Sequence, residues 1–313
     1  MPPALLFGTA TFGMSPPHLS TPSSLTPLLT TLPSLGIHRL DTAPRYPPLD
    51  PGRSEQLIGE TAEVSKGFVV DTKVYTDTGT DGGGDLGWEA MEGSVTGSLG
   101  RLGRERVYPT TPLEEQVRNF NEQIKRGRCK AWGVSNVPPA MLEEMLRICE
   151  EKGLQKPSCY QGDYNLITRG METKLLPILR AHGIAFIGFR PLAAGFLTGK
   201  ASTGQVEGTR FDASNPLGPI MNKNFGASEL HAGMKKFDDA VRKRGLSPAE
   251  VATRWLAHHS ALGDGDGIIL GASRVEQVVE TMGWIGKGPL EEELMSVAED
   301  LWEDVKGVRV EVI

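Results

Sequence analysis

Asp41, Tyr46 and Lys73 are the residues of this chain whose types and spacing best fit proton transfer. Tyr46 could act as a general acid that gives its proton to a carbonyl oxygen while hydride arrives at the carbon. An isolated phenol, with a pKa of about 10, is a weak acid at neutral pH, and a neighbouring ammonium lowers that pKa by favouring the phenolate. Lys73 would supply this ammonium, and Asp41 would keep it charged and oriented.

Each of the three residues also has an ordinary structural interpretation. Asp41 could cap a helix, Tyr46 could pack on a loop, and Lys73 could be an exposed charge at a strand end. Taken alone, each residue is better explained in that way. Together they favour the catalytic interpretation, because all three lie at or just after the ends of predicted strands, where (β/α) barrels place their chemistry.

The elements that would position these residues are short apolar segments alternating with amphipathic ones, which is typical of repeated βα units. The apolar segments predict strands at Leu5–Phe7, Arg39–Asp41, Phe68–Thr72, Ala131–Val134, Ser158–Gln161, Ala185–Phe189 and Gly267–Leu270. The amphipathic segments predict helices at Ser54–Glu63, Leu113–Arg126, Pro139–Lys152, Glu172–His182, Ala227–Arg244, Ser247–His259 and Arg274–Met282.

An eighth strand is expected near Val107, but the sequence there does not suit a strand. Pro109 and Pro112 lie close together, and proline cannot donate to an interior ladder. A chain of 313 residues is within the size range of one such barrel. The prediction is therefore a single α/β domain over residues 1–313, a (β/α)8 TIM barrel whose strand 4 is truncated or irregular.

Composition narrows the class of protein. Hydrophobic residues make up 39% and charged residues 23% of the chain, an ordinary globular balance. The net charge of −6 and a pI of about 5.6 argue against nucleic acid or an anionic membrane as the main partner. The three cysteines show no metal-binding spacing and predict free thiols in a reducing compartment. With no basic leader and no long apolar run, we expect a cytoplasmic protein; its oligomeric state is left open.

Two Gly/Pro-rich tracts, Thr78–Gly87 and Asn215–Gly226, predict loops within the barrel plan. The acidic tract Gly263–Gly267 lacks the spaced oxygen ligands and the terminal glutamate of a calcium loop. It predicts a turn before a strand, and no metal site is expected in the chain.

Eight short motifs occur in the order typical of one protein family. They are Gly8-Thr9-Ala10-Thr11-Phe12-Gly13, Asp41 with Tyr46, Ser54-Glu55-Gln56-Leu57-Ile58-Gly59, Thr72-Lys73, Gly133-Val134-Ser135-Asn136, Tyr160-Gln161, Phe189-Arg190-Pro191-Leu192-Ala193-Ala194-Gly195 and Gly271-Ala272-Ser273-Arg274-Val275-Glu276-Gln277. By these motifs the chain resembles the aldo-keto reductases over nearly its whole length. The resemblance is greatest to their aflatoxin-aldehyde-reductase-like branch, as found in fungi.

The resemblance implies a barrel enzyme that reduces aldehydes or ketones with NADPH, and it assigns residues to the cofactor. Ser135, Asn136 and Gln161 would hold the nicotinamide carboxamide, with Phe189 stacked on the ring where the family usually has tyrosine. Arg190 replaces a small polar residue and adds a cation near the pyrophosphate. Glycines in the loop that follows suit close approach of backbone N–H groups to phosphate. The remaining cofactor residues implied are Asp41, Pro191, Leu192, Gly195, Leu197, Lys200, Arg210, Gly271, Ser273, Arg274 and Gln277.

The chain departs from this family at one point. Relatives carry a histidine on the strand before the Thr-Pro-Leu-Glu-Glu helix start, whereas no histidine lies between His38 and His182 here. The passage from Val107 to Thr110 is several residues short of the family pattern. We expect both barrel closure and catalysis to suffer, because an edge loses its partner and the oxyanion loses a donor. Tyr108 is the nearest hydroxyl that could replace the imidazole.

Three hypotheses follow. The leading one is an NADPH-dependent reductase of aldehydes or ketones whose activity is reduced by the loss of the histidine. The second is a catalytically weak NADPH-binding sensor or subunit of the same fold. The third is a non-redox lyase or cyclase that uses Tyr46 and Lys73 as an acid–base pair. All three take a small molecule as partner.

Overall fold

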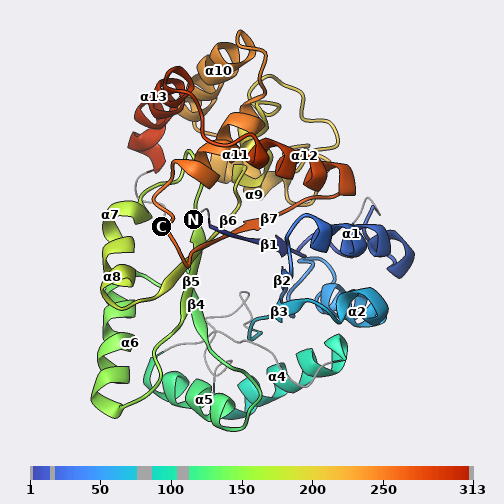
Figure 1. Cartoon of the computed structure of the whole chain (residues 1–313), viewed down its shortest axis with the longest axis vertical. Coiled ribbons are helices and arrows are strands. Elements are labelled where there is room, and N and C mark those ends of the chain that lie inside the picture. The colour runs from blue at the N-terminus through green and yellow to red at the C-terminus, as the bar shows by residue number, and fades with distance from the viewer. Residues whose placement is uncertain (1–2, 15–17, 76–86, 104–112, 310–313) are drawn as a thin grey trace.

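Seven parallel strands form one curled sheet at the centre of the molecule (Figure 1). The computed structural model describes residues 3–14, 18–75, 87–103 and 113–309. In the described sheet the strand order is β3-β2-β1-β7-β6-β5-β4, so β3 and β4 are its two edges. The strands are β1 (Ala4–Gly8), β2 (Arg39–Asp41), β3 (Val69–Asp71), β4 (Gly133–Ser135), β5 (Cys159–Asp163), β6 (Ala185–Phe189) and β7 (Gly267–Leu270).

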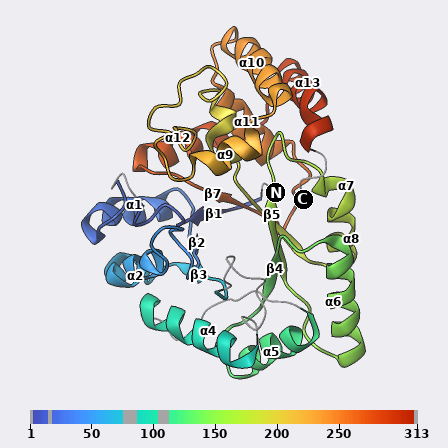
Figure 2. The ribbon, with the colours of Figure 1, turned by 180° about the vertical axis from the view of Figure 1, so that it is seen from behind.

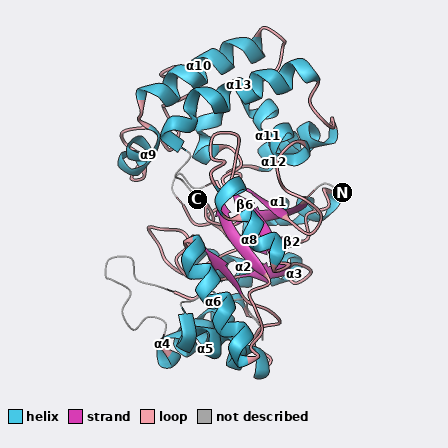
Figure 3. Cartoon of the chain, turned by 90° about the vertical axis from the view of Figure 1, so that its left-hand side faces the viewer, coloured by secondary structure: helices cyan, strands magenta, loops and turns pink. Residues whose placement is uncertain are grey.

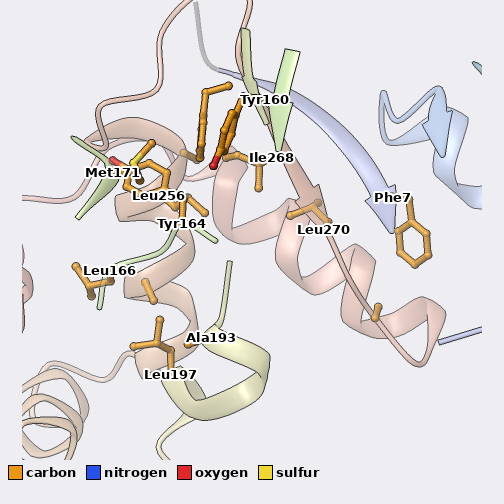
Figure 4. Close-up of a cluster of buried hydrophobic side chains, with 14 of the residues drawn as sticks. Phe7, Tyr160, Tyr164, Leu166, Met171, Ala193, Leu197, Leu256, Ile268 and Leu270 are labelled. Carbon is orange, nitrogen blue, oxygen red and sulfur yellow. The ribbon is translucent and has the colours of Figure 1, made fainter. Parts of the chain in front are cut away.

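Alternate residues of the strands point into the ring or out toward the helices, as the pleat requires. Leu6, Ile187 and Ile269 form a small apolar cluster on the inner face. The outward residues join the much larger core under the helices, part of which is drawn in Figure 4. Gly133 permits close pairing on the inner face, because a Cβ there would lie 2.5 Å from Cys159 Sγ.

The helices surround the sheet, with α10 and α13 at one end of the molecule and α4 and α5 at the other (Figures 2 and 3). In both ribbon views α4 and α5 lie on the side of the ring between β3 and β4. The helices are α1 (Pro22–Ser34), α2 (Arg53–Glu60), α3 (Ala62–Ser65), α4 (Trp88–Leu102), α5 (Leu113–Lys125), α6 (Pro139–Lys152), α7 (Met171–Lys174), α8 (Leu176–Ala181), η1 (Ala193–Thr198), α9 (Gly218–Phe225), α10 (Ser228–Arg242), α11 (Pro248–His258), α12 (Val275–Gly286) and α13 (Glu292–Arg309).

The predicted fold is confirmed. Each of the seven predicted strands is found within two residues of its expected bounds, and all pair in parallel. The truncated strand predicted near Val107 lies outside the described residues. The fourth strand that the structure describes, β4, pairs regularly with β5, with Ser135 opposite Gln161.

Other parts of the chain differ from the prediction. The tract Asn215–Gly226, predicted as a loop, contains helix α9, and its proline lies in the first turn, where a missing N–H costs nothing. Helix α1 was not predicted, because Pro27 and Pro33 remove backbone donors from its interior. Its four buried leucines and a capping box at Thr21 offset that loss. The Thr78–Gly87 loop lies outside the described residues except for Gly87.

Within the described segments no helix is at once long enough and apolar enough to cross a bilayer.

Candidate active site

Asp41 and Lys73 form an ion pair at the C-terminal ends of β2 and β3. Lys73 Nζ lies 2.8 Å from Asp41 Oδ1 and also donates to the backbone carbonyl of Thr42 at 2.8 Å. Both side chains are largely buried. The pairing follows from the register, because Asp41 lies opposite Asp71, so that Lys73 extends just beyond it. Lys73 is therefore not an exposed charge, and Asp41 does not act as a helix cap.

The Lys73 ammonium lies beside the ring of Tyr46, 5.2 Å from the ring centroid. Burial alone would lower the pKa of Lys73, but the carboxylates of Asp41 and Asp71 and the Tyr46 hydroxyl raise it well above its ordinary value. Lys73 thus remains a cation at every physiological pH. Among the described residues no hydrogen bond holds the Tyr46 hydroxyl, so this group is available to a substrate oxygen.

A buried hydroxyl network fixes the turn that carries Asp41 and Tyr46. Ser54, at the start of α2, donates to the backbone carbonyl of Thr9 at 2.9 Å and contacts the Thr9 hydroxyl at 2.8 Å. Thr9 in turn donates to the backbone carbonyl of Asp41 at 3.1 Å, and the backbone N–H of Ser54 donates to the carbonyl of Tyr46. The ends of β1, β2 and α2 are therefore joined behind the ion pair.

Glu55 is fully buried and holds Thr72, the residue that precedes Lys73. Its carboxylate accepts from Thr72 Oγ1 at 2.5 Å and from Arg101 Nε at 2.7 Å. The close approach of α2 to α4 depends on Gly59, where a Cβ would meet the carbonyl oxygen of Arg101 at 2.2 Å. The Ser-Glu motif that marks a helix start in the sequence is thus also a buried support for Lys73.

Gln161 on β5 lies beside Ser135, the last residue of β4, and Asn136, the residue after it. Gln161 Nε2 donates to Asp41 Oδ1 at 2.9 Å across the ring. Asn136, in a left-handed conformation with φ of 55°, donates its backbone N–H to the Gln161 carbonyl and its side-chain amide to Ser135 Oγ. The group places amide and hydroxyl functions beside the ion pair, which suits recognition of a carboxamide.

Arg190 follows Phe189 at the end of β6 and forms an ion pair that sequence reasoning missed. Its Nη1 lies 3.0 Å from the buried carboxylate of Asp163 at the end of β5, and its guanidinium also lies 5.4 Å from the centroid of the Phe189 ring. Asn165 bonds both the Asp163 carboxylate and the Arg190 carbonyl. Burial raises the pKa of Asp163, against the opposing effect of Arg190. The only signal in the sequence was the position of Asp163 on the same face of β5 as Gln161.

The segment after Pro191 and Leu192 has an unusual backbone. Ala193, Ala194 and Gly195 have φ values of 49°, 58° and 104° in succession. Left-handed conformations are costly for alanine, and such costs are concentrated at ligand-binding segments.

The side chains of this segment divide between the core and the surface. Ala193 and Leu197 are fully buried and appear among the core side chains of Figure 4, whereas Lys200 is exposed. Any contact of Leu197 with a cofactor would therefore involve its backbone.

Arg210 is a half-buried cation for which the described residues provide no hydrogen bond or ion pair. Burial lowers its pKa, and the charge of Arg190 lowers it further. The guanidinium groups of Arg210 and Arg190 therefore lie near one another, and Arg210 has no carboxylate partner in the part of the chain that the structure describes. An anion bound to Arg210 would offset both the burial of its guanidinium and the repulsion by Arg190.

The last predicted group lies after β7. Gly271 is exposed, and Gln277 Oε1 accepts from the backbone N–H and the hydroxyl of Ser273 at 2.8 and 3.1 Å. Arg274 is the residue that precedes α12, so the N-terminus of that helix lies at this point. Gln277 is thus bonded within the protein, while Arg274 has no ion pair among the described residues.

Three histidines bond with residues outside this site. His182 ends α8 and lies near Lys156 and Glu150, while His258 and His259 end α11. His231, which sequence reasoning did not discuss, contacts Ser202 on the loop after η1.

Comparison with known proteins finds matches over nearly the whole chain. A sequence model described as "Aldo/keto reductase family" matches residues 4–303. The oxidoreductase sirO of Leptosphaeria maculans is 36% identical, over 97% of this chain and 95% of that protein. Aflatoxin B1 aldehyde reductase member 2 of Mus musculus is 28% identical, over 97% and 85%. A crystal structure of an aldo-keto reductase from Klebsiella pneumoniae in complex with NADPH shares the fold, with a TM-score of 0.67, 20% identity and coverage of 99% and 95%.

Proposed function

The chain belongs to the aldo/keto reductase family, and we propose that it reduces an aldehyde or ketone to an alcohol with NADPH as the hydride donor. The observation that supports this most is the buried Asp41–Lys73 pair beside Tyr46, at the C-terminal ends of parallel strands. A proton donor, its activating cation and the anion that holds that cation are what carbonyl reduction requires of the protein.

The residues present fit NADPH. Arg210 is a cation without a described partner next to Arg190, and a phosphate would pair with it. The left-handed residues from Ala193 to Gly195 give this loop a backbone shape of the kind found at ligand-binding segments, and Gln161 with Asn136 offers amide groups for a carboxamide. Ser273, Arg274 and Lys200 would reach the adenosine end, with Arg210 favouring NADPH over NADH through the extra phosphate.

When bound, the cofactor supplies a hydride to the carbonyl carbon. The electron pair of the C=O bond then moves to oxygen, and Tyr46 donates its hydroxyl proton to that oxygen, so that the alcohol forms and a phenolate is left. Lys73 stabilises the charge on the phenolate, and Asp41 keeps the ammonium in place through its 2.8 Å contact. Water returns the proton to Tyr46 after the product leaves.

We further propose that turnover is slower than it would be with two hydrogen-bond donors to the substrate oxygen, because no histidine lies between positions 39 and 181. A reacting oxygen would then be held by Tyr46 alone, and loss of one donor costs about 10²–10³ in rate at comparable sites. The same observation favours a second candidate, an NADPH-binding protein with little catalytic activity.

The three cysteines are free thiols, which supports the expectation of a cytoplasmic location.

Binding and turnover separate these candidates in one experiment. NADPH binding is titrated by its fluorescence, and its oxidation is then followed by nicotinamide absorbance with aromatic and dicarbonyl aldehydes. Binding with turnover is the expected result, and the parallel Tyr46→Phe variant should bind NADPH without turning it over. Binding without turnover in the parent chain would favour the second candidate, and absence of binding would reject both.

A further inference from the structure

Arg39 and Asp71 form a second ion pair inside the ring, directly beside the first. Arg39 Nε lies 2.5 Å from Asp71 Oδ2, and Arg39 Nη2 donates to Asp71 Oδ1 at 2.9 Å, so the guanidinium binds both carboxylate oxygens. Arg39 precedes Asp41 by two positions on β2, and Asp71, the last residue of β3, precedes Lys73 by two. Residues two apart share a face of a strand, and all four charged side chains line the same cavity.

The four charges are crossed between the two strands. Asp41 lies opposite Asp71 in the register, and each carboxylate is bound by the cation of the other strand. Two carboxylates facing each other on adjacent strands repel unless each is compensated. All four side chains line one cavity, which Cys159 and Gln161 of β5 close from the opposite side.

Asp71 is a buried carboxylate, so the positive charge of Arg39 beside it is important. Burial raises the pKa of Asp71, and Arg39 acts against that effect. Asp71 also raises the pKa of Lys73, together with Asp41 and Tyr46. Cys159 is the other titratable group on this cavity, and burial raises the pKa of its thiol to about 11, so it is neutral at pH 7.

We propose that Arg39 and Asp71 act as a positioning pair for the catalytic ammonium, with Arg39 holding Asp71 so that Lys73 stays bound to Asp41 and Thr42. The proposal rests on the function proposed above, in which Lys73 serves Tyr46. Without Arg39, the Asp71 carboxylate would compete for Lys73 and would oppose negative charge on the phenol oxygen. Without Asp71, the Arg39 guanidinium would be an uncompensated cation in the same cavity.

The first test does not depend on activity. The variants Arg39→Met, Asp71→Asn and the combination of both are treated with an amine-reactive reagent at one alkaline pH, and labelling of Lys73 is followed by peptide mass spectrometry. Arg39→Met should slow labelling by about threefold or more, because an extra carboxylate favours the unreactive ammonium. Asp71→Asn should speed it, and the double variant should return to within about twofold of the parent chain.

The opposite signs separate positioning from a structural role. A merely loosened site would expose Lys73 and speed labelling in every variant, and that outcome would overturn the proposal, as would equal labelling throughout. Arg39→Lys keeps a cation and should label like the parent chain. Arg180→Met is the matched control, because Arg180 pairs with the buried Asp266 at 2.5 Å with nearly the same exposure, 42% against 43% for Arg39, and has no contact with Lys73.

Turnover provides the second readout. Arg39→Met should lower kcat for aldehyde reduction by about threefold or more and shift the alkaline limb of its pH profile upward, with the KM for NADPH within about twofold. Asp71→Asn should shift that limb downward. If the parent chain reduces no carbonyl compound, the proposed function fails, whereas the labelling result still decides whether Arg39 and Asp71 control Lys73.

Discussion

Gln161 donates its side-chain amide to Asp41 Oδ1 at 2.9 Å, and the same oxygen accepts from Lys73 at 2.8 Å. The hydrogen bond joins β5 to β2 across the ring, between positions 120 apart in the sequence. One N–H of the Gln161 amide is used by Asp41, so its carbonyl oxygen and its second N–H are left for a nicotinamide carboxamide. One side chain therefore connects the proposed cofactor residues with the proton-transfer residues.

Replacing Gln161 should affect both groups at once. In Gln161→Leu we expect kcat to fall by about tenfold and the KM for NADPH to rise, because a charged acceptor loses one donor and the carboxamide loses its acceptor. Steady-state kinetics with varied NADPH would measure both. Gln161→Glu should be more damaging, since it places a carboxylate beside Asp41. A change in KM alone would show that the bond to Asp41 has no role in catalysis.

Tyr46→Phe and Lys73→Met should each lower carbonyl reduction by about 10²–10⁴-fold, the usual contribution of general acid catalysis. The affinity for NADPH should stay within a few-fold, because neither side chain lies among the proposed phosphate contacts. Single-turnover rates and fluorescence titration would measure the two quantities separately. Full turnover by Tyr46→Phe would show that another group delivers the proton.

Arg210→Ala should raise the Kd for NADPH much more than the Kd for NADH, because its expected partner is the extra phosphate. Lys200→Ala should act in the same direction but more weakly, since Lys200 is exposed and its charge is screened. Titration of the parent chain and both variants with NADPH and with NADH gives the comparison. Equal losses for both cofactors would move Arg210 away from that phosphate.

His231 predicts a pH dependence of stability. Burial lowers its pKa, and the neighbouring Lys235 lowers it further. A group whose folded pKa is lowered contributes stability that is present above the unfolded value, 6.5 here, and is lost as the pH falls through the folded value. His231→Gln should therefore lose less stability than the parent chain between pH 7 and pH 5. Urea unfolding at both pH values tests this, and parallel losses would contradict it.

The absent histidine makes a prediction about activity. A version with a full strand and its histidine inserted between Val107 and Thr110 should turn over carbonyl substrates about 10²–10³-fold faster, because a second donor would hold the oxygen. It should also melt at a higher temperature through added ladder hydrogen bonds. Aldehyde reduction and thermal melting of both chains would be compared side by side. Equal behaviour would show that Tyr108 or water already serves as the second donor.

The strands could be predicted from the sequence because each is an apolar run between turn signals, and their parallel order follows from the alternation with helices. The pair of Asp41 and Lys73 could be expected for the same reason, since adjacent strand ends meet. Arg39 and Asp71 could not, because a charge at a strand position does not reveal its partner. The pair of Asp163 and Arg190 was missed for the same reason. Arg190 is 27 positions from Asp163 in the sequence and was interpreted only as a phosphate contact.

Helix α4 shows a different limit of sequence reasoning. Its glycines weaken the helical pattern, and α4 is stable because it packs on Gly59 of α2 and presents Arg101 to Glu55. Such tertiary support has no periodic signature in one sequence. The same applies to Pro27 within α1, where four buried leucines outweigh the local preference.

Lys73 follows a strand that is an edge of the described sheet, and the bonds that the described residues make to it come from the end of β2 and the residue after it. Thr72 is bound to Glu55, Lys73 to Asp41 and Thr42, and Asp71 to Arg39. The connection from β3 to β4 contributes to this support through Arg101 of α4, which binds Glu55. A change in the length of the connection after α4 would therefore leave the Asp41–Lys73 pair and Tyr46 in place, while the second donor to the substrate oxygen would be gained or lost with that connection.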